Sequence, residues 1–250
     1  HILKLLQEFL ELIMRIVGWI MKLAPLGIFA LLTTLIATQN LELLSTVGGF
    51  IVLVFATTLF HAVVVLPLIL YLFTKKSPLW FWRGAREALV TAFATSSSSA
   101  TVPVTLRCVE DNLRVRKNIA GFVVPLGATI NMDGCGGIFP AIAAIFIAHI
   151  YGIPLDALDY LLIAGTATLA SVGTAGVPGT AMVMLTVTLS VVGLPIEGIA
   201  FIAAVDRIID MMRTATNVTG DTMVALVIGR SEGLVQTPAE PAQHNTAVAS

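Results

Sequence analysis

The sequence predicts an all-α membrane protein with full transmembrane helices, broken transmembrane helices and two opposed re-entrant helical hairpins. Hydrophobic residues make up 57% of the chain and charged residues 12%, whereas soluble domains have about 45–50% and 25%. Apolar segments long enough to cross a bilayer, about 20 residues, alternate with shorter ones that Ser, Gly or Pro interrupt. This composition predicts that a lipid bilayer surrounds the chain. The net charge of −1 points to no nucleic acid partner.

Residues 1–78 are predicted to form two transmembrane helices. The first apolar segment runs from about Leu10 to Ala37, and we expect a bend at Pro25, since proline removes a helical hydrogen bond. The second runs from about Val47 to Phe73 and is interrupted by His61, which we interpret as a packed core histidine. The chain begins at His1 without a methionine, so we expect an N-terminal part to precede it.

Residues 79–230 alternate between segments that are too short to span and segments that span. Residues 84–112 hold two short apolar halves around "TSSSSATVP", and residues 157–193 hold two more around "SVGTAGVPGT". Each pair predicts a re-entrant hairpin. Residues 116–150 can span but carry "NMDGCGG" in the middle, which predicts a helix with an unwound centre. Residues 197–230 form a charged spanning helix, and the polar tail over 231–250 is predicted to be disordered.

The distribution of basic residues sets the expected orientation. Cytoplasmic loops of membrane proteins carry an excess of Lys and Arg, and the basic residues of the middle of the chain fall in two loops: Lys75, Lys76, Arg83, Arg86, Arg107, Arg114, Arg116 and Lys117. We therefore expect the Ser-rich hairpin to enter from the cytoplasm and the "GTAGVPG" hairpin from outside. Gly- or Pro-interrupted segments in corresponding positions of two halves point to a transporter site near the bilayer midplane.

The last helix carries a stripe of polar side chains. Asp206, Asp210, Arg213, Asn217 and Asp221 fall within about 80° of arc on a helix with 100° per residue. Charged groups are expensive in hydrocarbon unless they face protein, water or a ligand. One interpretation is a salt-bridge stripe that holds helices together. The other is a site for a cation or a substrate amine, because three carboxylates share the stripe with one guanidinium.

A second set of oxygen ligands is predicted in "GATINMDG". Where a helix unwinds, its carbonyl oxygens become available to Na⁺, and Thr129, Asn131 and Asp133 add side-chain oxygens. The hairpin tips "SSSSATVP" and "GTAGVPGT" offer amides at helix N-termini, which attract anions such as carboxylates. We expect Cys108 and Cys135 to be free buried thiols rather than a disulfide or a metal site.

Four motifs in this order, "SSSSATVPVT", "PLGATINMDG", "ASVGTAGVPG" and "DRIIDMMRTATNVTGD", resemble the C-terminal part of the dicarboxylate/amino acid:cation symporter family, the sodium-coupled glutamate transporter family. The resemblance covers about Gly27 to Gly229 and implies a transport domain that moves as an elevator against a trimeric scaffold. Residues 79–230 would be that transport domain, and residues 1–78 would belong partly to the scaffold. It also implies an integral membrane protein of the plasma or bacterial inner membrane.

The resemblance also implies site residues. Asp210 corresponds to the ligand of the substrate amine, Arg213 to the partner of a side-chain carboxylate, and Asn217 to the ligand of the α-carboxylate. The hairpin-tip contacts correspond to Ser96, Ser97, Ser98, Val177, Pro178 and Gly179. Where the family usually has Thr or Ser after "NMDG", this sequence has Cys135, followed by Gly136 and Gly137. Cys135 is therefore the implied substrate contact that departs from the family pattern.

Sodium ligands are implied in the same way. One site corresponds to Gly127, Asn131, Asn217 and Asp221, a second to Thr129, Ser171, Val172 and Thr174, and part of a third to Asn131 and Asp133.

The function that we expect is sodium-coupled symport of an acidic amino acid (glutamate or aspartate) or a dicarboxylate, with bound Na⁺ as coupling ion and no enzymatic chemistry. A proton-coupled or neutral-amino-acid member of the same family is the alternative, and an ion channel with pore loops is a more distant one. The position of Arg213 among carboxylates suits a zwitterion with an extra acid group better than a bare cation.

Overall fold

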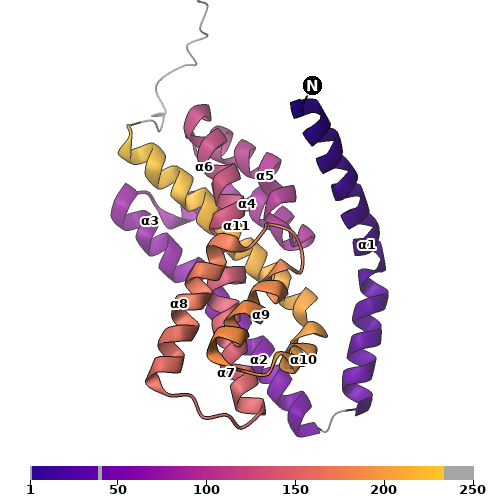
Figure 1. Ribbon diagram of the computed structural model, residues 1–250. Helices are drawn as coiled ribbons and strands as arrows, with labels where there is room; N and C mark the ends of the chain where they lie inside the picture. The colour runs from indigo at the N-terminus through magenta and orange to yellow at the C-terminus, as the bar shows by residue number, and fades with distance from the viewer. Residues whose placement is uncertain (1, 39–40, 234–250) are drawn as a thin grey trace, which may run out of the picture.

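The computed structural model describes residues 2–38 and 41–233, and this part of the chain contains helices and no strands (Figure 1). The prediction of an all-helical protein is thus confirmed. Two helical stretches in the described part, Ser45–Thr74 and Lys117–Ile150, are long and apolar enough to cross a membrane. The tail expected to be disordered lies almost entirely outside the described residues, and the last helix runs as far as Ser231.

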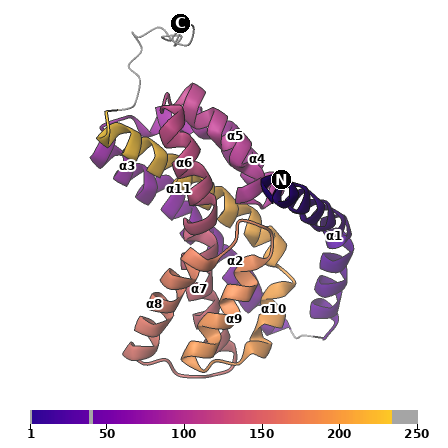
Figure 2. The ribbon, with the colours of Figure 1, turned by 45° about the horizontal axis from the view of Figure 1, so that its top comes forward.

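The first two helical stretches are a bent helix that stands beside the others and a long helix that contains one wider turn. Helix α1 (Ile2–Thr38) contains Pro25 and continues past it; Figure 2 shows it bent and standing beside the other helices. The second stretch consists of α2 (Leu41–Phe60), a π-helical turn η1 (His61–Val65) and α3 (Leu66–Thr74). The interruption predicted at His61 is therefore a wider helical turn and not a break.

The Ser-rich segment folds as two short helices that meet at a tip. Helix α4 (Pro78–Thr95) ends at Ser96, whose φ of 51° lies in the left-handed region. Helix α5 (Ser98–Arg107) begins after Ser97, whose hydroxyl oxygen accepts a hydrogen bond from the backbone N–H of Ala100. This N-cap satisfies one of the free N–H groups at the start of α5, and a π-helical turn η2 (Cys108–Asn112) extends the helix.

The "NMDG" segment interrupts the next helix. Helix α6 (Lys117–Ile130) stops before Asn131 and Met132, which have non-helical backbone angles. The chain then resumes as a π-helical stretch η3 (Asp133–Ile138) and helix α7 (Phe139–Ile150). Because residues 131–132 are unwound in the middle of a long apolar segment, their backbone groups are free to contact other elements.

A second pair of short helices follows. Helix α8 (Ala157–Gly173) starts at a capping box formed by Asp156 and Asp159, and α9 (Thr180–Val192) follows a non-helical tip over residues 174–179. A short 3₁₀ turn η4 (Ile196–Gly198) and helix α10 (Ile199–Ala203) then lead into the last helix, α11 (Asp206–Ser231). The sequence predicted one helix over 197–230, but a turn at residues 204–205 interrupts it, so that Asp206 begins a new helix.

Helix α11 lies at the centre of the structure. It contacts α2, α3, α4, α5, α6 and η3, and Figures 1 and 2 show it passing between these elements. One apolar cluster contains Phe50, Phe139 and Phe146 and joins α2 to α7 and α9. A second, with Leu70 and Phe81, joins α3 and α4 to α6 and α11. The polar stripe of α11 is therefore enclosed by apolar packing on both sides.

Candidate functional site

The polar stripe predicted on the last helix faces the interior of the protein. Asp206, Asp210, Arg213, Asn217 and Asp221 all lie on α11 and are buried, each no more than 9% exposed. Such groups are costly to bury unless each has a partner. The contacts of these side chains therefore define what the site can hold.

Arg213 is completely buried but only partly hydrogen-bonded. Its Nη2 atom lies 2.6 Å from Asp206 Oδ1 and 3.2 Å from Asp210 Oδ1, and its Cζ atom lies 3.8 Å from the centre of the Phe139 ring. Its Nε and Nη1 atoms have no hydrogen-bond partner. A guanidinium carries five N–H donors in a fixed fork, so Arg213 retains donors that can grip an anion.

Asp210 connects this end of the stripe to η3, directly after the unwound residues 131–132. Its Oδ1 atom lies 3.6 Å from the Sγ atom of Cys135 in η3. Both cysteines are free and buried, as predicted. The fold thus brings together Cys135, Asp210 and Arg213, three of the residues predicted to contact substrate.

The other end of the stripe meets the unwound segment through amide groups. Asn131 Nδ2 donates to Asp221 Oδ1 at 2.9 Å, and the backbone N–H of Gly134 donates to Asn217 Oδ1 at 2.8 Å. Asn217 Nδ2 donates to the Sδ atom of Met132 at 3.2 Å. The segment "NMDG" therefore contacts the last helix through Asn131, Asn217 and Asp221, which the sequence predicted as ion ligands.

The residues around Asp221 carry the types of oxygen ligand that a sodium ion prefers, namely one carboxylate and the amide oxygens of Asn131 and Asn217. In this structure Asn131 turns its Nδ2 atom toward Asp221 and Asn217 Oδ1 accepts the Gly134 N–H, so both amides would have to reorient to bind an ion. A Cβ atom at Gly127 would lie 2.5 Å from Asp221 Oδ1, so this close approach of α6 requires glycine. The described part of the chain holds no group of three or more His, Cys, Asp or Glu side chains that could bind a metal ion by themselves, so backbone oxygens would have to complete the site.

The second predicted set of sodium ligands is only partly assembled. The backbone N–H of Met132 donates to Ser171 Oγ at 3.2 Å, which joins α8 to the unwound segment. Thr174 is buried, but its hydroxyl donates to Ala170 O in its own helix. Thr129 is exposed and its hydroxyl donates to Leu126 O, and Val172 is 60% exposed. The side chains of Thr129 and Val172 are therefore not part of the contact that joins Ser171 to Met132.

The two hairpin tips touch each other. Ser97 Oγ donates to Gly176 O at 2.8 Å, and the backbone N–H of Ser99 donates to the same oxygen at 3.0 Å. Ser96, Ser97 and Ser98 are buried, and the Ser96 hydroxyl has no hydrogen-bond partner. The tip of α8 and α9, with Val177, Pro178 and Gly179, therefore lies against the serines that the sequence predicted as substrate contacts.

The interpretation of His61 as a packed core histidine is wrong. Its side chain is 24% exposed, and its Nε2 atom lies 3.0 Å from Asp133 Oδ2. His61 and Asp133 line one wall of a cavity of about 510 Å³ between η1, η3 and α8. Asp133 lies 72 positions away from His61 in the sequence. The helical spacing of residues around His61 therefore could not predict this contact.

These observations describe a membrane protein whose buried polar site is assembled from two short-helix pairs, an interrupted helix and a charged helix. The sequence model of the sodium:dicarboxylate symporter family matches residues 1–231, and the chain belongs to this family. The chain is accordingly part of an integral membrane protein.

Individual relatives are similar over most of this chain. Excitatory amino acid transporter 2 of Mus musculus is 42% identical over 231 residues, which is 90% of this chain and 40% of that protein. Excitatory amino acid transporter 1 of Ambystoma tigrinum is 46% identical over 222 residues, 87% of this chain and 40% of the relative. The human transporter 1 is 45% identical over the same shares. The chain thus spans about two fifths of the length of these relatives.

Proposed function

We propose that this chain forms the substrate- and ion-binding part of a sodium-coupled symporter for an acidic amino acid or a dicarboxylate. The observation that carries the proposal is Arg213, which is fully buried beside Asp206 and Asp210 and still has unpaired donors at Nε and Nη1. A salt-bridge stripe that only held helices together would be expected to satisfy its guanidinium. An acidic substrate supplies a carboxylate that a guanidinium binds through two parallel hydrogen bonds.

The polar groups around Arg213 suggest how each end of an amino acid would be held. Asp210 would bind the ammonium group, Asn217 the α-carboxylate and Arg213 the side-chain carboxylate. Ser96, Ser97, Ser98 and the backbone of Val177, Pro178 and Gly179 would cover the substrate at the hairpin tips, with Cys135 lining the site next to Asp210. The names of the relatives, excitatory amino acid transporters, support an amino acid as the substrate class.

Sodium is the proposed coupling ion. Gly127, Asn131, Asn217 and Asp221 would hold one ion; Thr129, Ser171, Val172 and Thr174 a second; and Asn131 with Asp133 would contribute to a third. The positive charge of the ion would offset the negative charge of buried carboxylates such as Asp221. Family membership supports sodium, and so does the set of oxygen donors at Asp221.

The proposed mechanism needs the two short-helix pairs to act as re-entrant hairpins and the site to cross the membrane with them. In this proposal residues 79–230 move as one elevator domain, whereas the helices within 1–78 belong partly to the scaffold of a homotrimer. The buried tip contacts Ser97–Gly176 and Ser99–Gly176 would close the site during that movement. A gate of this kind keeps substrate and ions together, which symport requires.

A thermal-shift panel tests the proposal. The protein in detergent is heated with glutamate, aspartate, succinate, alanine or serine, each with Na⁺ or with choline in its place. Because a ligand that binds only the folded state raises its apparent stability, we expect a shift for acidic compounds that requires Na⁺. A sodium-dependent shift with alanine or serine but not with aspartate would favour a neutral-amino-acid transporter. A shift that depends on pH and not on Na⁺ would favour proton coupling.

A further inference from the structure

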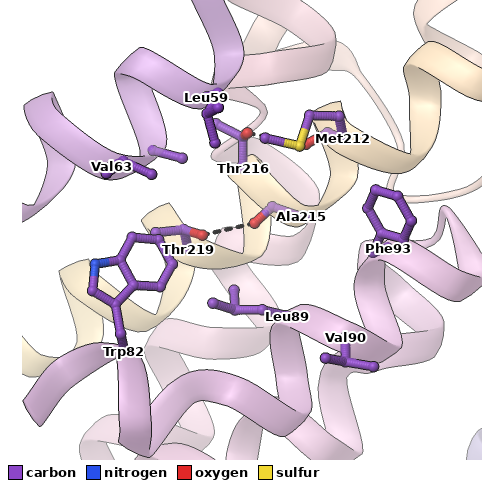
Figure 3. Close-up of a pocket in the computed structure, with 11 residues that line it drawn as sticks. Leu59, Val63, Trp82, Leu89, Val90, Phe93, Met212, Ala215, Thr216 and Thr219 are labelled. Carbon is purple, nitrogen blue, oxygen red and sulfur yellow. Dashed lines mark hydrogen bonds between the residues drawn. The ribbon is translucent and has the colours of Figure 1, made fainter. Parts of the chain in front are cut away.

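An apolar groove of about 290 Å³ lies on the outside of the helix bundle, away from the polar site. Its walls come from α2 and η1 on one side and α4 on the other, and α11 forms its floor (Figure 3). Large side chains form the rim, among them Leu59, Val63, Val90 and Phe93, each at least 40% exposed. The groove is therefore open along its length to whatever surrounds the protein.

The floor of the groove offers no polar group to a ligand. Its two hydroxyls bond the backbone of their own helix: Thr216 Oγ1 donates to Met212 O at 3.0 Å, and Thr219 Oγ1 donates to Ala215 O at 2.8 Å (Figure 3). Figure 3 also shows the side chains of Trp82, Leu89 and Phe93 projecting toward this floor from α4. An occupant of the groove must therefore be apolar along its length.

The end of the groove near Trp82 has a basic side chain on the same face. On a helix with 100° per residue, Arg86 falls about 40° from Trp82, between Leu89 and Val90 in angle. Arg86 is exposed, and no ion pair involves it in the described part of the chain. Lys75 and Lys76 precede α4, so this is the end that the positive-inside rule assigns to the cytoplasm.

We propose that this groove binds an anionic phospholipid, with one acyl chain between η1, α4 and α11 and the headgroup phosphate at Arg86. Hydrocarbon fits the apolar trough, and the exposed guanidinium next to it complements an anionic headgroup. A second transmembrane helix fits less well, because close helix packing in membranes favours small residues and the rim here is Leu, Val and Phe. The lipid site is independent of the transport activity proposed above.

Trp82 provides the measurement, because it lines the groove. The whole chain, with Trp19→Phe and Trp80→Phe so that Trp82 is the remaining tryptophan, is reconstituted in phosphatidylcholine bilayers. Quenching of Trp82 fluorescence is then followed as lipids with dibrominated acyl chains are added. One series uses phosphatidylglycerol and the other uses phosphatidylcholine at the same mole fractions.

We expect the anionic lipid to quench Trp82 at about fivefold lower mole fraction, since one basic residue near the membrane surface contributes about 1 kcal/mol toward an anionic lipid. Arg86→Gln should abolish this difference. Lys117→Gln removes a charge from the exposed start of α6, outside the groove, and should retain it. Equal quenching by the two lipids, or a preference that survives Arg86→Gln, would overturn the proposal. Absence of quenching by either lipid would also overturn it, since a protein segment or a second copy would then cover the groove.

Discussion

At the scale of the residue, Arg213 illustrates how a membrane protein keeps a charge in its interior. Two carboxylates share one of its nitrogen atoms, Nη2, and the Phe139 ring covers the guanidinium face. Arginine remains charged under all ordinary conditions, so this arrangement holds a permanent cation in a fixed position. The donors left over at Nε and Nη1 make Arg213 the residue on which substrate specificity is expected to depend.

Replacing Arg213 by Ala should abolish the binding of acidic substrates while sparing or improving the binding of alanine or serine. Removing one partner of a buried charge pair costs about 2–5 kcal/mol, roughly thirtyfold to several thousandfold in affinity. Calorimetric titration of aspartate and serine measures both effects, with Arg230→Ala, an exposed arginine at the end of α11, as the matched control. Equal weakening of aspartate and serine would mean that Arg213 is a structural partner of Asp206 and Asp210.

Asp221→Asn is predicted to remove the effect of sodium on substrate binding without unfolding the protein. An asparagine can still accept the hydrogen bond from Asn131, but it lacks the negative charge that offsets a bound cation. Stabilisation by sodium at about 100 times its Kd, about 2.7 kcal/mol, should disappear in thermal unfolding. Asp111→Asn, in an exposed position of η2, should leave it intact. If sodium still stabilises the Asp221→Asn variant, the ion does not bind at Asp221.

The contact between His61 and Asp133 makes a separate prediction about stability. A hydrogen bond of this kind contributes about 1 kcal/mol, so a double-mutant cycle of His61→Ala and Asp133→Ala should give a coupling energy of about that size. Unfolding is measured without sodium, so that ion binding does not contribute to the result. Additivity of the two single changes would indicate that the Nε2–Oδ2 contact is not formed in solution.

At the scale of the element, the interruptions of the helices place the polar groups. Helices α4 and α5 meet at Ser96 and Ser97, and α6 ends at Ile130, just before Asn131. Each interruption therefore presents backbone and side-chain groups toward α11 or toward the opposite tip. The interruption at residues 204–205 was not predicted, because "FIAAVDR" contains neither Gly nor Pro. Asp206 therefore lies in the first turn of α11, where its carboxylate contacts Arg213 two helical turns further along the same helix.

The contact between the two tips depends on a glycine. A Cβ atom at Gly176 would clash with Ala128 O and would lie 2.7 Å from Ser99 Oγ. Gly176→Ala should therefore separate the tips and weaken substrate binding at least tenfold, since the Ser97 and Ser99 hydrogen bonds to Gly176 O would be lost together.

The control for this change lies in the same helix pair. Gly165, inside α8, has open space where a Cβ would be placed, so Gly165→Ala should be neutral or stabilising by up to about 1 kcal/mol. Substrate titration and thermal unfolding of both variants check the prediction. If Gly176→Ala binds substrate like the parent protein, the tips do not have to touch for binding.

At the scale of the whole molecule, residues 1–250 alone are predicted not to transport. The chain spans about 40% of the length of its relatives, and α1 stands beside the other helices (Figure 2), as expected if further scaffold normally packs there. Liposomes that contain only these residues should show no sodium-driven aspartate uptake, and cross-linking should detect no trimer. Uptake above that of protein-free liposomes would contradict this expectation. A complete relative, such as excitatory amino acid transporter 1 of Ambystoma tigrinum, serves as the positive control.

Sequence by itself determined the helical class, most of the helical elements and the set of polar side chains that share one face of the last helix. Apolar length and the positions of Ser, Gly and Pro are local properties, so they predict where helices begin, stop or unwind. The polar stripe on α11 could also be predicted from local sequence, because helical periodicity fixes which side chains share a face. For the same reason the sequence could nominate Asp210, Arg213, Asn217 and Asp221 together, although their roles remain predictions.

Tertiary structure alone decided which segments meet. His61 reaches Asp133, Ser97 reaches Gly176, and Asn131 reaches Asp221 across 72, 79 and 90 positions of sequence. No periodicity relates residues on different helices, so their pairing follows from how the apolar clusters pack around α11. Packing also left the groove beside Trp82 open and kept two nitrogen atoms of Arg213 unpaired. This packing sets the distances between helices, which the covalent chain alone does not fix. It therefore decides which buried polar groups find a hydrogen-bond partner within the protein and which remain available to a ligand.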